Sequence, residues 1–314
     1  MVRSRVSHSQ LVLSTVQSSQ AAVSSVAASW CRSALRHGLD PSRLPRQDRL
    51  DARALGELRD ANGELLAVAT PVLDRLFSHV GQTGCGVIIS DLDGMILDAR
   101  SSAGDAPLFD AAGLVAGASW SEASEGTNGI GTCLVEGRPV TIHRHEHFAS
   151  RNVDVSCMDA PIFDPVGQIV AALDVSSARA DHGEPMARLI AALVQDAART
   201  IERDFFCRRY ADARIVLAEG AARGQALLAV DRDDLVVGAT RAARQQFGLG
   251  MAAHFDPRPL GDVLGGEEGA LNDNGRAVLR QALARSGGNV AAAAKLLGIG
   301  RATFYRRMER AGMA

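Results

Sequence analysis

The sequence predicts an α+β protein built from several small modules, with helices at both ends of the chain and antiparallel sheets between them. Three observations predict this class. Apolar residues recur at helical spacing before residue 80, short apolar runs pair around turns after it, and the last forty residues have the pattern of three short helices. The 314 residues are 46% apolar and 22% charged, as in average globular proteins, which excludes a wholly disordered chain.

Residues 1–79 are expected to form an N-terminal helical region. Leucines are spaced so that many of them share one helix face, which is typical of amphipathic helices that bury one side. Pro41 and Pro45 divide the region. The leucines that carry the pattern are Leu55, Leu58, Leu65, Leu66, Leu73 and Leu76.

Three pairs of apolar runs, each around an aspartate-containing turn, predict three β-hairpins. The turns are Asp91–Gly94, Asp164–Gly167 and Asp231–Asp234. The first two hairpins place one sheet domain at residues 80–205, and the third belongs to a smaller module with its tether at residues 206–270. The tether itself is expected at Gly261–Gly275, which is rich in Gly, Asp, Glu and Asn.

A long helix is expected from Pro185, because proline is well tolerated in the first turn of a helix. An apolar stripe follows at intervals of three and four residues. The stripe packs on its own domain or also forms the seam of a homodimer. Its members are Met186, Leu189, Ile190, Leu193, Ala197 and Ile201.

The net charge of −2 hides an uneven distribution. Residues 275–314 carry eight of the 34 basic residues and one of the 36 acidic ones, which leaves 26 basic and 35 acidic residues upstream. The tail therefore has a net charge of +7 on a body of −9. Such a basic tail indicates that one end of the chain meets a polyanion.

Residues 271–314 have the pattern of a helix-turn-helix domain. A helix over Arg276–Ser286 ends at two glycines, Asn289 caps a second helix that Gly298 stops, and a third helix runs over Arg301–Arg310 with Phe304 inside. The outer surface of the third helix suits the major groove, where arginine pairs with guanine. The predicted DNA-binding residues are Asn289, Lys295, Arg301, Ala302, Thr303, Tyr305, Arg306, Arg307 and Arg310.

These last forty residues resemble the Fis-type DNA-binding module at the end of bacterial enhancer-binding activators. The resemblance rests on Gly287–Ile299 and Arg301–Arg307. It departs at Gly300, where the family commonly has Ser or Asn. Loss of that helix cap costs about 1 kcal/mol or less, because glycine is a tolerable cap.

The middle of the chain resembles the GAF sensor domain of acetoin-catabolism-type activators. The motifs are Ser119–Glu122, Glu125–Thr132, Glu146–Phe148 and Asp159–Ile162, and the resemblance extends to Ala28–Pro41 near the N-terminus. In that family a PAS module, an ATPase and the Fis-type module follow. Here the third hairpin resembles a short PAS module, and the ATPase is missing.

The lysine content agrees with a missing ATPase. Lys295 is the only lysine, and it lies between Ala294 and Leu296. A phosphate-binding loop of the form G-x-x-x-x-G-K-[ST] is therefore excluded. ATP-driven promoter opening is not available to a chain without that loop.

The GAF resemblance implies a small-molecule site between the sheet and its covering helices and loops. The predicted ligand-binding residues are Trp120, Glu125, Asn128, His147 and Phe148. The alternative is that these residues hold the loop together through caps and turn hydrogen bonds.

Histidines and cysteines offer two further possibilities. His143, His145 and His147 alternate and would share one face of a strand near Cys157, as ligands of zinc or iron. Exposed histidines, or a strand that ends before His147, are the alternative. Cys133 and Cys157 would form a redox pair of the kind found in GAF-fold methionine sulfoxide reductases, or are ordinary core residues.

We therefore expect a ligand-responsive, sequence-specific DNA-binding transcriptional regulator, not an enzyme. Its expected partners are double-stranded DNA with a near-palindromic operator, a small-molecule effector, a second copy of the chain and RNA polymerase. We expect no cofactor, no metal and no catalytic residue. The five cysteines without a C-x-x-C pair and the lack of an export or anchor segment favour a cytosolic protein. The alternatives are a redox or metal enzyme and a ligand-independent architectural DNA binder.

Overall fold

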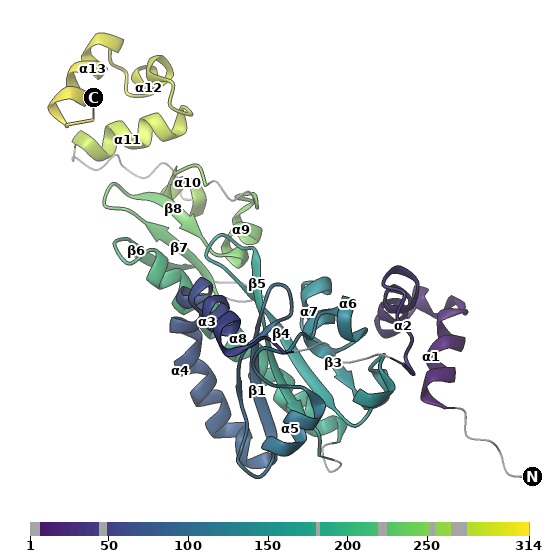
Figure 1. Cartoon of the computed structure of the whole chain (residues 1–314). Coiled ribbons are helices and arrows are strands. Elements are labelled where there is room, and N and C mark those ends of the chain that lie inside the picture. The colour runs from purple at the N-terminus through teal and green to yellow at the C-terminus, as the bar shows by residue number, and fades with distance from the viewer. Residues whose placement is uncertain are drawn as a thin grey trace, which may run out of the picture. The chain divides into compact units, whose positions relative to one another are not determined.

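The computed structural model describes residues 7–43, 49–179, 183–218, 225–251, 255–264 and 275–313. Figure 1 shows the helices and strands of the chain. The chain divides into two compact units. The first comprises residues 1–163 and 169–202, and the second comprises residues 164–168 and 203–314. Antiparallel sheets with helices around them confirm the predicted α+β class.

The first unit contains a five-stranded antiparallel sheet in the order β2-β1-β5-β4-β3. The first two predicted hairpins are confirmed as β1–β2 and β4–β5. The central strand β5 is buried from Ala171 to Ser177 because both faces of the sheet are covered. The strands are β1 Cys85–Asp91, β2 Ile96–Arg100, β3 Val140–His143, β4 Ser156–Phe163 and β5 Ile169–Ser177.

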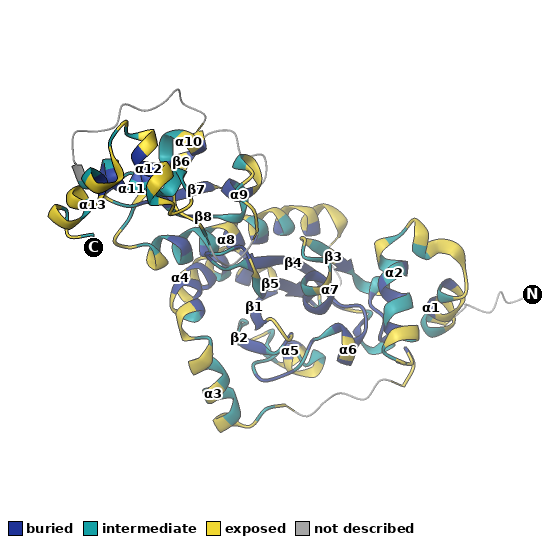
Figure 2. Ribbon diagram, turned by 90° about the horizontal axis from the view of Figure 1, so that it is seen from above, coloured by how far each residue is buried: buried dark blue, intermediate teal, exposed yellow. Residues whose placement is uncertain are grey.

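Helices cover both faces of this sheet, as Figure 2 shows. On one face lie α3 Ala52–Ala61, α4 Gly63–Val80 and the long α8 Glu184–Arg209. On the other lie α5 Ala106–Ala112, α6 Glu122–Glu125 and α7 Gly129–Glu136. The predicted stripes face inward in part, because Leu65, Leu73 and Leu76 of α4 and Ile190 and Ile201 of α8 are buried. Among the described residues, no helix combines the length and apolarity needed to cross a bilayer.

Two N-terminal helices, α1 His8–Val16 and α2 Ser25–Cys31, pack beside the β3 end of the sheet. Ser7 and Ser24 cap them through their side chains. Trp30 donates its indole N–H to the carbonyl of Glu146 at 2.8 Å. The helices of residues 1–79 therefore pack at two different sites. Helix α4 packs on β1, and α2 packs on the loop after β3.

The three hairpin turns have the same geometry. In each, one aspartate oxygen accepts backbone N–H bonds from the second and fourth following residues, at 2.8–3.0 Å. The fourth turn position has positive φ, and it is glycine in the first two turns but Asp234, at φ 61°, in the third. The turn that is repeated in the sequence is thus also repeated in the structure. The first residues of the three turns are Asp91, Asp164 and Asp231.

The second unit begins with a small module, here called the PAS-like module. Its four antiparallel strands have the order β6-β7-β8-β9, and they are β6 Arg214–Ala218, β7 Ala226–Val230, β8 Leu235–Ala239 and β9 Arg258–Pro259. Helices α9 Arg241–Phe247 and α10 Leu260–Leu264 complete it. The predicted tether at Gly261–Gly275 is wrong at its start, because Val263 is buried in this core and residues 261–264 are helical. Residues 265–274 lie outside the described residues.

Three helices form the helix-turn-helix module: α11 Gly275–Arg285, α12 Val290–Leu296 and α13 Arg301–Arg310. Its small core contains Leu279, Ala282, Ala293, Ala294 and Phe304. The alanines of α12 let the neighbouring helices approach closely. All three predicted helices are present at the predicted positions.

Candidate nucleic-acid interface and sensor site

Cap residues and glycines mark the ends of α12 and the start of α13. The Asn289 side chain accepts the backbone N–H groups of Ala291 and Ala292, as a helix cap does. Gly298 has φ 64° and ends α12. Gly300 occupies the cap position of α13 without a side-chain hydrogen bond. Asn289 is exposed at the turn, and its observed partners are backbone groups.

Five cations lie on the exposed surface of α12 and α13: Lys295, Arg301, Arg306, Arg307 and Arg310. In the described part of the chain, no carboxylate lies within 4.0 Å of any of them. Arg306 donates to the Thr303 hydroxyl at 3.3 Å, and the Arg301 guanidinium lies 5.7 Å from the Tyr305 ring centre. These contacts pre-orient the two arginines while their charge remains uncompensated.

The other predicted members of this surface surround the arginines. Ala302 and Tyr305 are exposed and Thr303 is half-buried, while Phe304 on the opposite side is fully buried. The 100° helical spacing thus places the side chains as the sequence predicted. Their role in DNA binding stays a prediction.

The basic tail contains a second, different set of cations on α11. Arg280 is paired with Asp231 at 2.7 Å and with Asp233, and Arg285 is paired with Asp262 at 2.8 Å. The basic residues of the tail therefore fall into two sets. Five cations on α12 and α13 have no carboxylate partner among the described residues, and arginines on α11 form ion pairs with aspartates of the PAS-like module. The two sets could not be told apart in the sequence, because pairing partners that lie 23 to 49 residues upstream leave no local signal.

The predicted sensor residues are buried and have partners within the protein. Trp120 is 2% exposed, packs in the core between the sheet and α5–α7, and donates its indole N–H to Gly113 at 2.7 Å. Glu125 accepts from Arg151 at 2.5 Å and from the Asn152 amide at 3.1 Å. Glu125 is the last residue of α6, and both of its partners lie in the 3₁₀ turn Ser150–Asn152.

Asn128, His147 and Phe148 complete the predicted set. Asn128 caps α7, because its side chain accepts the Gly131 N–H at 2.8 Å. His147 donates from Nδ1 to the Arg144 carbonyl at 3.0 Å, which leaves Nε2 as the acceptor 3.4 Å from Cys157 Sγ. Burial lowers the pKa of His147 to about 4, so the ring is neutral at pH 7. Phe148 packs with Trp30 and Val12 under α1 and α2.

The five residues therefore take part in core packing, capping, ion pairing and hydrogen bonds within the protein. Trp120 and Phe148 belong to separate apolar clusters. Contact of any of them with an effector stays a prediction.

Sequence reasoning missed a buried polar network that joins α2 to α6 and α7. The Glu122 carboxylate, 2% exposed, accepts from Arg32 at 2.7 and 3.0 Å and from the Ser29 hydroxyl at 2.9 Å. Hydrogen bonding to Glu122 raises the pKa of Arg32. The detectable signal was Glu122 at the end of the Ser119–Glu122 motif, but its partners lie about ninety residues upstream.

A pair of buried carboxyls was missed as well. Asp159 on β4 and Asp174 on β5 face each other across the two strands and are 2% and 0% exposed. Burial and the neighbouring Asp174 charge raise the pKa of Asp159 well above its usual range, and burial raises the pKa of Asp174 to about 7. Two adjacent carboxyls in such a site hold a proton between them near neutral pH.

The strand of alternating histidines is not formed. β3 ends at His143, and a 3₁₀ turn over Arg144–Glu146 follows, with Arg144 at φ 48°. The period-2 alternation that would have put three imidazoles on one face is therefore lost. Within the described ranges there is no group of three His, Cys, Asp or Glu side chains that could hold a metal ion.

The two candidate redox cysteines are buried. Burial, together with nearby Asp159 and Asp174, raises the pKa of both the Cys133 and the Cys157 thiol well above the usual range. A thiol in such surroundings is a poor nucleophile, because the thiolate is the reactive form. The local electrostatics oppose thiol chemistry at this site.

Comparison with known proteins finds a matching family model for each end of the chain. Residues 3–203 match the family model of the MimR N-terminal domain, and residues 275–310 match the Fis family of bacterial regulatory proteins. The interval between the matches, residues 204–274, contains the PAS-like module.

Two curated relatives illustrate the similarity. The acetoin catabolism regulatory protein of Cupriavidus necator is 30% identical over 277 residues, which are 83% of this chain and 41% of that protein. The propane 2-monooxygenase operon transcriptional activator MimR of Mycolicibacterium smegmatis is 32% identical over 160 residues, 50% of this chain and 26% of that protein. The chain thus spans less than half the length of these relatives.

A solved structure shares the fold. The E. coli DhaR(N)–DhaL complex contains a chain that is 14% identical with a TM-score of 0.52, covering 73% of this chain and 78% of that chain. At this identity the likeness concerns the fold alone. The family match covers well over half of the sequence, so the chain belongs to the MimR N-terminal-domain family and carries a Fis-type helix-turn-helix at its end.

Proposed function

We propose that this protein is a sequence-specific DNA-binding transcriptional regulator whose α13 enters the major groove. The observation that carries the proposal is the set of five exposed cations on α12 and α13 that have no carboxylate partner among the described residues. Desolvating arginines for DNA is favourable when phosphates and guanine edges replace water. The Fis-family match supports the same function.

The individual roles follow from position on the helix. Arg306, held by Thr303, reads a guanine edge, and Ala302, Thr303 and Tyr305 contact neighbouring bases or sugars. Arg301, Arg307 and Arg310 flank the helix where phosphates lie. Lys295 and the exposed end of α12 at Asn289 contact the backbone of the opposite groove wall.

We propose that the protein acts as a homodimer. Two recognition helices about 34 Å apart would occupy successive major-groove turns of a near-palindromic operator. The relatives named above regulate acetoin catabolism and a propane 2-monooxygenase operon. By analogy this chain controls genes for the breakdown of a small organic compound, in contact with RNA polymerase and without ATPase-driven promoter opening.

The first unit is proposed to sense that compound or a product of it. Its interior has what a small-molecule site requires, namely an apolar core with a few buried polar groups near Trp120, Glu125, Asn128, His147 and Phe148. Because these residues are engaged in the present conformation, effector binding requires the two segments that carry them, one around α6 and one after β3, to rearrange.

The test of DNA binding uses the full-length chain and a library of random duplexes. Bound duplexes are selected, and affinity for the enriched sequence is measured by fluorescence anisotropy at several salt concentrations. A symmetric enriched sequence and a steep fall of affinity with salt are expected. Arg307→Ala should lower the salt slope by about 1, whereas Arg188→Ala on the exposed surface of α8 should leave it unchanged.

Sensing is tested separately by mass spectrometry of small molecules that co-purify with the protein. Any molecule found is then added back in the anisotropy assay. A change in operator affinity supports a sensor, while an unchanged affinity with every candidate favours the architectural alternative. Failure to enrich any duplex, or binding that does not respond to salt, contradicts the proposed function as a whole.

A further inference from the structure

Within the second unit, α11 contacts two modules at once. Leu279 and Ala282 pack toward α12 and α13 of the helix-turn-helix module. Arg280 and Gln281 lie between them in sequence and bond instead to the β7–β8 turn of the PAS-like module. The helix therefore forms the contact between the DNA-binding module and the module that precedes it in the chain.

The contact is built on a preformed acidic turn. Asp231 uses Oδ1 to accept two backbone N–H groups of its own turn, which points Oδ2 toward Arg280 at 2.7 Å. Asp233 of the same turn is 2% exposed and also accepts from Arg280, while its backbone carbonyl accepts the Gln281 amide at 3.0 Å. Because the turn is fixed by its own hydrogen bonds, little entropy is lost when Arg280 docks.

A second ion pair strengthens the same surface. Arg285 at the end of α11 makes a two-pronged contact with Asp262 of α10, at 2.8 and 2.9 Å. Bidentate arginine–carboxylate pairs fix orientation as well as distance. We call the set Arg280, Arg285, Asp231, Asp233 and Asp262 the α11 latch.

Electrostatics favour the docked state. Burial alone lowers the pKa of Arg280, but the hydrogen bonds and charges of Asp233 and Asp231 outweigh it and raise the pKa. A carboxylate as buried as Asp233 is costly without its cation. Undocking of α11 must therefore rehydrate Asp233.

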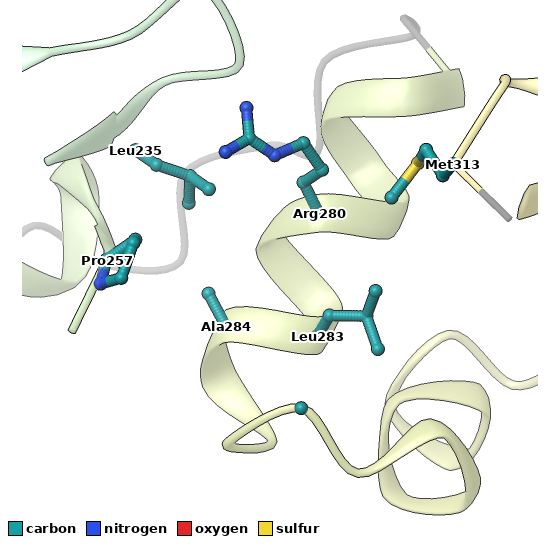
Figure 3. A pocket seen from close by; sticks show the side chains of 7 residues that line it. Leu235, Pro257, Arg280, Leu283, Ala284 and Met313 are labelled. Atoms are coloured by element: carbon teal, nitrogen blue, oxygen red, sulfur yellow. The ribbon is translucent and has the colours of Figure 1, made fainter. Parts of the chain in front are cut away.

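The rest of the contact is not tightly packed. Beside Arg280 there is an open pocket of about 260 Å³, lined by Leu235 and Pro257 from the PAS-like module and by Leu283, Ala284 and Met313 from the helix-turn-helix module (Figure 3). A polar contact next to an unfilled apolar pocket is typical of a small, reversible contact between modules.

We propose that the α11 latch docks the helix-turn-helix module onto the PAS-like module and thereby passes movements of the PAS-like module to the recognition helix. The free cations of α12 and α13 take no part in the latch, so docking and DNA binding are compatible. The transmission of an effector signal rests on the proposed function, whereas the docking itself does not.

The docking can be measured without DNA. Lys295 is the only lysine and is exposed on α12. After the N-terminal amine has been acetylated near pH 7, where it is far more reactive than a lysine, a fluorophore on Lys295 reports the tumbling of the helix-turn-helix module. Time-resolved anisotropy of the full-length chain then separates slow tumbling of the docked module from faster independent motion.

Asp231→Asn/Asp233→Asn keeps the shape of the turn but removes the charges that hold Arg280. The fast component is expected to rise roughly twofold or more in amplitude, and to rise in the unsubstituted chain as salt is added. Asp212→Asn, an exposed residue of the same unit, is the control and should change nothing. If the turn variant does not fold by circular dichroism, Arg280→Gln breaks the same pairs from the other side.

An equal anisotropy decay in the unsubstituted chain and in a folded latch variant would overturn the docking. The consequence for regulation is tested with the selected operator. Latch variants should bind a single half-site with unchanged affinity but lose the response of operator affinity to the effector. A latch variant that docks loosely yet responds normally refutes the transmission, and absence of any DNA binding refutes the proposed function and not the docking.

Discussion

The recognition surface of α12 and α13 and the glycine-rich motif of residues 119–132 were both identified from the sequence, yet they have opposite physical characters. The cations of the first are exposed and have no carboxylate partner in the described ranges. The polar groups of the second are buried and paired, through Glu122, Glu125 and Asn128. An exposed surface keeps the arrangement that helical periodicity gives it, whereas a buried motif acquires partners from distant segments.

The largest loss of stability is expected when the packing of the buried motif is disturbed. A Cβ on Gly131 would lie 2.8 Å from the Trp120 carbonyl oxygen and 2.7 Å from the Ser121 carbonyl carbon, both backbone atoms. Gly131→Ala should destabilise the first unit by more than about 3 kcal/mol. Urea denaturation followed by Trp fluorescence measures it.

Gly56→Ala is the matched control, because no atom lies within 4 Å of a Cβ at that position of α3. It should stabilise the chain by about 0.5–1 kcal/mol. A Gly131→Ala protein as stable as the original would mean that the motif is not packed as described.

The buried carboxyl pair predicts a pH dependence with a definite sign. The folded-state pKa of Asp174, about 7, lies above the unfolded value of about 3.8, so the folded state binds more protons between these values. Stability is fully present below the unfolded pKa and is lost as the pH rises through the folded one. Between pH 5 and pH 8 the loss from Asp174 alone should be roughly 2.5 kcal/mol.

Asp174→Asn tests the assignment, because an amide does not ionise. Its unfolding midpoint should fall less between pH 5 and pH 8 than that of the unsubstituted chain. The fall that remains belongs to Asp159, because burial raises the pKa of that carboxyl as well. Asp110→Asn, a surface residue of the same unit, should retain the original slope. An unchanged slope in Asp174→Asn would locate the titrating group elsewhere.

On the exposed recognition surface, two neighbouring arginines are expected to differ in their effect on DNA binding. Arg306→Ala should cost about 1–3 kcal/mol of operator binding and relax specificity, because a base contact is lost. Arg307→Ala should weaken specific and random duplexes alike. Neither should alter the unfolding midpoint, since both side chains are exposed. Equal losses on both kinds of duplex for Arg306→Ala would contradict its base-reading role.

The smallest effect is expected at the start of the recognition helix. Gly300 has the extended conformation of a helix cap, at φ −67° and ψ 149°, but lacks a side chain to accept an N–H. Gly300→Ser should stabilise the helix-turn-helix module by a few tenths of a kcal/mol. Hydrogen exchange of the α13 amides detects such a difference, and faster exchange would mean that the serine does not cap the helix.

Much of the fold was predictable because local rules govern it. The aspartate turns encode their own hydrogen bonds, so three hairpins were located to within a few residues. The helices after residue 274 followed from Asn289, Gly298 and the spacing of Phe304. The alternating histidines wrongly predicted a longer strand. β3 ends at His143, because the chain turns at Arg144, which has positive φ.

The sequence by itself determined the order of the modules, the two sheets with their hairpins and the outward-facing side of α13, because turn chemistry, capping and helical periodicity act over a few residues. Only the tertiary structure decided which charges are free. Arg280 and Arg306 are the same residue in the same basic tail, but Arg280 meets Asp231 and Asp233 from almost fifty residues away, and Arg306 meets no carboxylate among the described residues. Pairing energies depend on distance and burial, and neither can be read from the order of residues along the chain.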